Sequence, residues 1–405
     1  MSSNLLHTPI GVRDIYGKEC MEKMAVEDAI SAVMVSYGYR YIQTPTFEFF
    51  DIFNAERGSV SSKDMYKFFD RAGSTLVLRP DITPSIARCA SKYFMEEDMP
   101  IRLCYKGNTF INSSEYQGKL KEFTQLGAEL ICDDSSGADA EMIAMLVESL
   151  LKSGLEDFRV EIGEAEFFKA IIEESNINIE IEDSLREYID SKNYFEVEKL
   201  IAGQYIDDDI KNVFLKLPEL FGTVEILETA KKITKNKRAL NAIKSLENLY
   251  KLLEMYNLEK YVSFDLGMLS QYKYYTGVIF KAYTYGAGDS IVTGGRYDNL
   301  IEQFGKNAPS IGFAINIDQL ILALARQKIN IPIDYSNTMV IYNENEQVQA
   351  IKYVKEQRIK NKRIELIRKN PNKNFEDYVE FAKRNQIDKI VLFDNDLIRT
   401  VEVKA

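Results

Sequence analysis

Gly294-Gly295-Arg296-Tyr297-Asp298 decides the fold of this chain, together with Tyr274-Tyr275-Thr276-Gly277 before it and Ser310-Ile311-Gly312-Phe313-Ala314 after it. The three motifs alternate with short strand-like stretches at 262–265 and 278–283. Their tyrosines supply aromatic walls and hydroxyl groups that can donate or accept hydrogen bonds. We interpret the three motifs as the frame of a binding site.

The chain upstream of this frame has the mixed pattern of an α+β domain. Helices are predicted at 18–37 and 137–153, and strands at 39–47, 74–78, 101–109 and 123–131. Pro45 has no N–H to donate to a sheet, so it breaks the strand at 39–47 and implies an edge or interface position for it. A polar loop at 112–119 separates the last two strands, which should therefore pair antiparallel.

Two further segments differ in pattern from this domain. Residues 165–260 are almost wholly helical in pattern, and we interpret them as an insertion because strands resume at 262–265. Pro332 marks a boundary near 327–336. Beyond it the chain alternates between the two patterns, with strands predicted at 338–342, 363–368, 389–393 and 400–404 and helices at 345–360 and 374–385. Residues 333–405 should therefore form a small α/β domain.

Composition excludes several classes of protein. The 405 residues carry a net charge of −11, which argues against general nucleic-acid binding. No run of about eighteen apolar residues and no signal peptide is present, so we expect neither a membrane span nor export. The four cysteines have no CxxC spacing and the only histidine is His7, which predicts free thiols in a reducing cytoplasm and no metal site.

No familiar catalytic motif is present. The chain lacks a GxxxxGK[ST] phosphate loop and a G-x-S-x-G nucleophile elbow, and a single histidine leaves no usual general base. We expect no catalytic residue and no cofactor.

Five separated elements in fixed order resemble histidyl-tRNA synthetase, a class II enzyme, over residues 8–325. They are Thr8 to Asp14, Gly38-Tyr39 with Thr44-Pro45, Leu78-Arg79-Pro80-Asp81-Ile82-Thr83 with Arg88, Phe110 to Gln125 with Gly127 and Glu129, and the tyrosine–glycine frame. The resemblance implies an antiparallel sheet with flanking helices over residues 1–325, a helical insertion at about 165–260, and a reduced anticodon-binding-like domain at 333–405.

At three positions where the resemblance implies arginines that grip ATP and the activated carboxylate, this chain has Ile111, Ser270 and Gln319. Planar arginine forks hold phosphates by charge-assisted contacts worth about 1.5–3 kcal/mol each. Losing three costs roughly 4.5–9 kcal/mol, on the order of a thousand- to a million-fold in rate. We therefore expect no aminoacylation.

The positions that would hold the amino acid are retained, by the same resemblance. They are Asp81, Thr83, Gln125, Glu129, Tyr274, Tyr275 and Tyr297. Carboxylates suit an ammonium group, and amide or phenol groups suit an imidazole nitrogen. Taken singly, each has a structural alternative: Asp81 can cap a helix, Glu129 can be a surface strand residue, and Tyr275 can belong to the core.

A chain with this combination looks like the regulatory subunits of ATP phosphoribosyltransferase, a family paralogous to histidyl-tRNA synthetase. That resemblance implies a hetero-oligomer with a short catalytic subunit, L-histidine as feedback effector in the first step of histidine biosynthesis, and a homodimer that pairs around Pro45. It implies no membrane contact, and tRNA binding is not expected. The alternatives are an atypical histidyl-tRNA synthetase and an accessory pseudo-synthetase scaffold.

Overall fold

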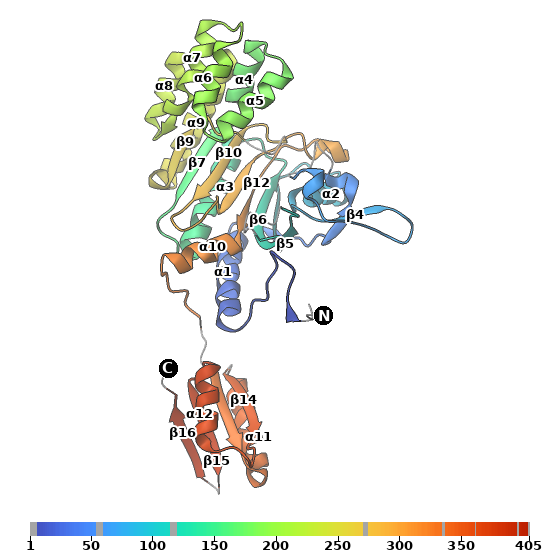
Figure 1. Cartoon of the computed structure of the whole chain (residues 1–405), viewed down its shortest axis with the longest axis vertical. Coiled ribbons are helices and arrows are strands. Elements are labelled where there is room, and N and C mark those ends of the chain that lie inside the picture. Colours follow the sequence, from blue (N-terminus) through green and yellow to red (C-terminus); the bar gives the residue numbers. More distant parts are fainter. Residues whose placement is uncertain are drawn as a thin grey trace. The chain divides into compact units, whose positions relative to one another are not determined.

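The computed structural model describes residues 6–53, 60–113, 120–269, 274–333, 337–360, 362–394 and 397–403. The chain divides into two compact units, Met1–Ile331 and Pro332–Ala405 (Figure 1). In the described ranges, no helix is both long and apolar enough to cross a membrane.

A nine-stranded sheet organises the first unit, in the order β1-β5-β6-β12-β11-β10-β7-β9-β8. The strands are β1 (Arg40–Tyr41), β5 (Ile101–Phe110), β6 (Glu122–Ile131), β7 (Arg159–Glu164), β8 (Phe221–Gly222), β9 (Val262–Asp265), β10 (Val278–Tyr283), β11 (Val292–Arg296) and β12 (Ser310–Asn316). The central strands pair antiparallel, while β1 with β5 and β7 with β9 are parallel. The predicted antiparallel pairing of β5 with β6 is confirmed, from Ile101 opposite Ile131 to Phe110 opposite Glu122.

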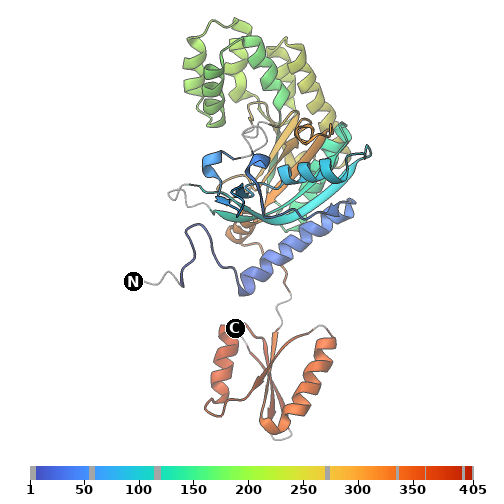
Figure 2. The same cartoon turned by 90° about the vertical axis from the view of Figure 1, so that its right-hand side faces the viewer.

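Helices cover both faces of this sheet. They are α1 (Gly17–Ser36), α2 (Thr83–Tyr93), α3 (Ser136–Lys152) and α10 (Ile317–Arg326). Helices α1, α3 and α10 pack together on one face, where α1 runs along the sheet (Figure 2). On the other face, Ile82 and Ile86 of α2 join a buried cluster with Leu103 and Tyr105 of β5. This cluster extends to Tyr274, Tyr275 and Tyr297, so α2 and the tyrosine–glycine frame share one core.

The break predicted at Pro45 in the strand at 39–47 is present, and the two parts belong to different sheets. The chain forms β1 at the edge of the large sheet and β2 (Phe47–Phe49) at the edge of a small sheet with β4 (Thr75–Leu78) and β3 (Lys67–Phe69). Between them, the carbonyl oxygens of Thr44 and Pro45 accept hydrogen bonds from the Arg79 guanidinium, at 2.9 and 3.2 Å. These carbonyls are turned away from any strand partner, and Pro45 has no N–H to offer one.

The segment between β7 and β9 is helical, as predicted. It contains α4 (Ala165–Ser175), α5 (Ile179–Asp190), α6 (Tyr194–Ala202), α7 (Asp208–Lys216), α8 (Glu225–Ile233) and α9 (Lys237–Met255), interrupted by the unpredicted strand β8. Side chains of Asn178, Asn193, Asp207 and Asn236 cap four of these helices. Buried Phe167, Phe214 and Leu246 give the insertion a core of its own.

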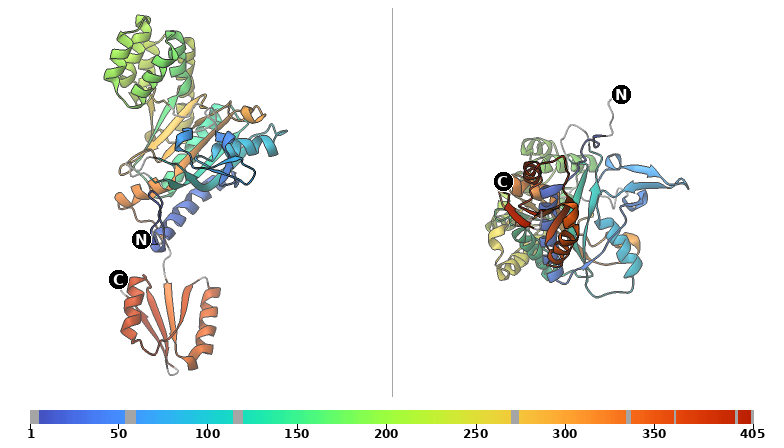
Figure 3. Two further views of the ribbon diagram at one scale, coloured as in Figure 1. Left: turned by 45° about the vertical axis from the view of Figure 1, so that its right-hand side comes forward. Right: turned by 90° about the horizontal axis from the view of Figure 1, so that it is seen from below.

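The second unit is a four-stranded sheet in the order β14-β13-β15-β16, with one helix on each face (Figure 3, left). Its elements are β13 (Asn337–Tyr342), α11 (Gln347–Ile359), β14 (Arg363–Arg368), α12 (Phe375–Arg384), β15 (Lys389–Asp394) and β16 (Leu397–Glu402). Val340 packs into the apolar cluster beneath α11. Its neighbours Met339 and Ile341 point to the other face and pack into the cluster beneath α12. The last strand lies earlier than the predicted 400–404.

Candidate functional site

All seven side chains predicted to hold an amino acid line one cavity of about 20 Å³ in the first unit. Asp81 and Thr83 lie at the start of α2, and Gln125 and Glu129 lie on one face of β6. Tyr274 and Tyr275 precede β10, and Tyr297 follows β11. The rest of the described wall consists of Thr293, Gly312, Phe313 and Ala314.

Gly312 makes room for the most buried acid of this cavity. It stands directly opposite Glu129 in the pairing of β12 with β6. A Cβ atom at residue 312 would lie only 1.6 Å from Glu129 Oε2. The Glu129 side chain therefore fits here because residue 312, the glycine of the Ser-Ile-Gly-Phe-Ala motif, has no side chain.

Glu129 is held by two hydroxyl groups inside the protein. Its side chain is 1% exposed, Thr83 Oγ1 donates to Oε1 at 2.7 Å, and the Tyr297 hydroxyl donates to Oε2 at 2.6 Å. Burial raises the pKa of Glu129 to about 8, although both hydrogen bonds favour the ionised form. The surface-strand alternative for Glu129 is wrong.

Asp81 has two roles in the structure. Its Oδ1 accepts the main-chain N–H of Ile82 at 2.7 Å, which supports the start of α2, so the helix-capping alternative is part of the answer. Its Oδ2 accepts the Tyr274 hydroxyl at 3.4 Å on the cavity side. Tyr274 also packs edge-to-face against Tyr275 and Tyr297, with ring centroids 5.0 and 5.9 Å apart. Tyr275 belongs both to the core cluster and to the cavity wall.

The chemistry of this wall favours a ligand with N–H donors and positive charge. Two carboxyl groups, of Asp81 and Glu129, face the cavity, and none of its described lining residues is Lys, Arg or His. The buried Oε1 of Gln125 has no hydrogen-bond partner among the described residues, so it is an acceptor available to a ligand. A volume of about 20 Å³ holds about one water molecule, so a larger ligand must displace a wall.

A second cavity, of about 140 Å³, lies at Ile111, one of the three positions where the resemblance implies an arginine that binds ATP. It shares Asp81, Gln125, Thr293 and Ala314 with the first cavity. Ile111 lines it beside Phe123, and its described lining residues include no cation. Gln319 lies in the first turn of α10 and lines neither cavity. Ser270 lies outside the described residues.

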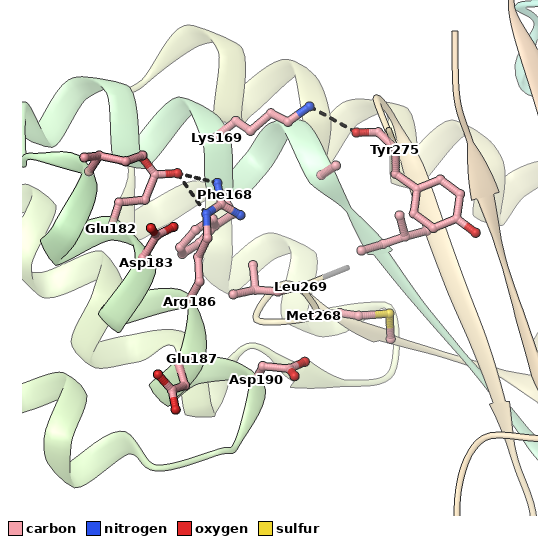
Figure 4. Close-up of a pocket in the computed structure, with 13 residues that line it drawn as sticks. Phe168, Lys169, Glu182, Asp183, Arg186, Glu187, Asp190, Met268, Leu269 and Tyr275 are labelled. Carbon is pink, nitrogen blue, oxygen red and sulfur yellow. Dashed lines mark hydrogen bonds and ion pairs between the residues drawn. The ribbon is translucent and has the colours of Figure 1, made fainter. Parts of the chain in front are cut away.

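Sequence reasoning missed a larger cavity, of about 450 Å³, between the helical insertion and the sheet (Figure 4). Its described walls come from the consecutive helices α4 and α5 and, about eighty residues later in the chain, from Met268, Leu269, Tyr275 and Ile279. In the described part of the chain, no group of three or more His, Cys, Asp or Glu side chains could hold a metal ion.

Comparison with known proteins gives consistent matches. The family model of histidyl-tRNA synthetase matches residues 11–320. The ATP phosphoribosyltransferase regulatory subunit of Ruminiclostridium cellulolyticum is 37% identical, over 100% of this chain and 96% of its own length. That of Acetivibrio thermocellus is 41% identical over 84% of this chain and 81% of its own length.

Solved structures show the same relationship. The crystal structure of an ATP phosphoribosyltransferase regulatory subunit/histidyl-tRNA synthetase from Bacillus halodurans has a TM-score of 0.86 at 28% identity, covering 96% of this chain and 98% of that one. Histidyl-tRNA synthetase from Nostoc has a TM-score of 0.80 at 19% identity, covering 98% of this chain and 97% of that one, and so shares the fold.

Proposed function

We propose that this chain, which belongs to the histidyl-tRNA synthetase family and within it to the ATP phosphoribosyltransferase regulatory subunits, senses L-histidine and reports it to a catalytic partner. Its role is that of a regulatory subunit in the first step of histidine biosynthesis. The partner is a short-form catalytic subunit that joins ATP to phosphoribosyl pyrophosphate.

The cavity that gathers the seven predicted side chains is the observation that carries this proposal. A histidine offers an ammonium group and an imidazole N–H, and the cavity offers two carboxyl groups and the unpartnered Gln125 Oε1. Each charge-assisted hydrogen bond contributes about 1.5–3 kcal/mol. Three such contacts suffice for a micromolar to millimolar effector.

We further propose that the chain does not activate histidine with ATP. The α-phosphate of ATP would meet Ile111 and Phe123 in the adjoining cavity, where no described side chain carries a positive charge. Desolvated phosphate without a cation is strongly disfavoured. An atypical synthetase would need positively charged side chains at this place to bind the phosphates of ATP.

A homodimer is the proposed minimal assembly. Phe47, Phe49 and Phe69 of the small sheet are 52, 57 and 72% exposed, and the first two follow shortly after Pro45 in the chain. Aromatic groups of this size are typically covered by a partner surface. A second copy of the chain, related by a twofold axis, would cover the same residues on both copies.

We also propose a cytoplasmic location and no tRNA binding. All four cysteines are free in the structure, which suits a reducing compartment. The net charge of −11 opposes long-range attraction to RNA.

Two measurements on the purified chain test the proposal. Millimolar L-histidine should raise the melting temperature, because a ligand that binds only the folded state stabilises it. Co-expression with a short catalytic subunit should yield a complex whose ATP phosphoribosyltransferase activity requires both chains. Histidine-dependent pyrophosphate exchange would instead establish an atypical synthetase, and absence of both the thermal shift and the complex would favour an accessory scaffold.

A further inference from the structure

The cavity of about 450 Å³ between the helical insertion and the sheet, called the large cavity below, has the size and lining of a ligand site. Its volume of about 450 Å³ falls in the range of roughly 300–1,000 Å³ that is typical of small-molecule sites. Met268 and Leu269 form part of its apolar floor with Phe168 of α4 and Ile279 of β10. Ile179, which is 66% exposed, adds an apolar group at the edge.

The charge of its wall decides the class of ligand. Helix α5 turns Asp183, Glu187 and Asp190 toward the cavity along one face (Figure 4). Among the described residues, neither Asp183 nor Glu187 has an ion-pair partner, and like charges four residues apart destabilise a helix. The two cations of the described wall are both engaged. Arg186 pairs with Glu182 at 2.7 Å and lies 5.0 Å from the centre of the Phe168 ring, and Lys169 donates to the Tyr275 carbonyl oxygen.

Tyr275 connects this cavity to the small one. It lines both, and its carbonyl oxygen accepts a hydrogen bond from Lys169 Nζ of α4 at 3.1 Å. The small cavity, at about 20 Å³, must expand to admit an amino acid. Because Tyr275 lines both cavities, a displacement of its ring toward the large cavity would widen the small one.

We propose that the large cavity binds an organic cation with an apolar body, and that its occupancy opposes ligand entry into the small cavity by blocking the displacement of Tyr275. The apolar part contacts Met268 and Leu269, and the cationic group meets Asp183 and Glu187. The site itself is independent of the proposed function; only the coupling rests on histidine binding in the small cavity.

The binding test uses 3-phenylpropylamine as the probe and its uncharged analogue 3-phenylpropanol as the comparison. Protein carrying ¹³C-methyl methionine reports occupancy through the Met268 signal, assigned with Met268→Leu. We expect the amine to shift this signal and to bind at least about tenfold more tightly than the alcohol. Asp183→Asn/Glu187→Gln should remove this preference, while Glu180→Gln/Glu198→Gln, which changes the charge equally outside the cavity, should retain it.

The coupling test titrates L-histidine by calorimetry with and without saturating amine. Because coupling is reciprocal, each ligand should lower the affinity of the protein for the other ligand by the same factor, about fivefold or more. An unshifted Met268 signal, or equal amine binding by the two double variants, would overturn the site. Unchanged histidine affinity in the presence of bound amine would overturn the Tyr275 coupling. Histidine that does not bind at all would refute the proposed function and the coupling, while the amine result would still decide the site.

Discussion

Replacing Glu129 by glutamine should stabilise the unliganded protein while weakening its hold on histidine. The ordinary pKa of this carboxyl group is 4.5, and burial raises it to about 8 in the folded protein. Between these two values the folded state keeps a proton that the unfolded state has lost. The free energy of unfolding therefore falls as pH rises through this window, and levels off above about pH 8.

The size of the effect follows from the pKa difference. At about 1.4 kcal/mol for each pKa unit, the rise from 4.5 to about 8 corresponds to at most about 5 kcal/mol. Glutamine keeps an acceptor oxygen for one of the two hydroxyls, of Thr83 and Tyr297, offers its NH2 group as a donor to the other, and never ionises. We expect Glu129→Gln to match wild type near pH 4.5 and to be more stable by about 2–5 kcal/mol at pH 8.5.

Urea unfolding of the full chain, followed by circular dichroism at both pH values, measures this difference. Glu180→Gln on the exposed part of α5 is the control and should change neither value. Glu164 is also buried with a pKa raised to about 8, so Glu164→Gln should share the stabilisation but leave histidine binding intact. A difference between Glu129→Gln and wild type that is equal at both pH values would refute the reasoning.

Four further outcomes follow from the same geometry. Gly312→Ala should abolish histidine binding, because the new Cβ would lie 1.6 Å from Glu129 Oε2; calorimetry checks this. Gln125→Leu should lower the affinity for histidine by roughly ten- to a hundredfold. It should slightly stabilise the unliganded chain, since Gln125 Oε1 has no hydrogen-bond partner among the described residues. An unchanged affinity would show that Gln125 does not contact histidine. Histidinamide should bind within about threefold of histidine, because no described wall residue of the two adjoining cavities is a cation that could pair with a carboxylate; much weaker binding would reveal a carboxylate partner. Ile111→Arg alone should not produce histidine-dependent pyrophosphate exchange, because positions 270 and 319 remain serine and glutamine; measurable exchange would show that one arginine is enough.

The sequence was sufficient to predict the antiparallel core and the set of residues around the small cavity. Both depend on ordered motifs, and the pairing of β5 with β6 follows from two apolar strands around one polar loop. The strand at 39–47 breaks at Pro45 as predicted, but the sequence did not show that Arg79, more than thirty residues away, binds the Thr44 and Pro45 carbonyls. Such a side-chain contact has no local sequence signal.

The burial of Glu129 and the presence of the large cavity also could not be predicted from the sequence. Glu129 reads equally well as a surface strand residue until β12 places Gly312 opposite it and Tyr297 beside it. The large cavity depends on how α5 lies against Met268, about eighty residues later in the chain.

The most direct test of the central claim measures inhibition by histidine in the reconstituted enzyme. A short catalytic subunit is assayed for ATP phosphoribosyltransferase activity over a range of L-histidine concentrations, with wild-type chain and with Gly312→Ala. We predict that both chains form the active complex and that only the wild-type complex is inhibited by histidine. Equal inhibition of the two complexes would contradict the claim that this cavity is the histidine sensor.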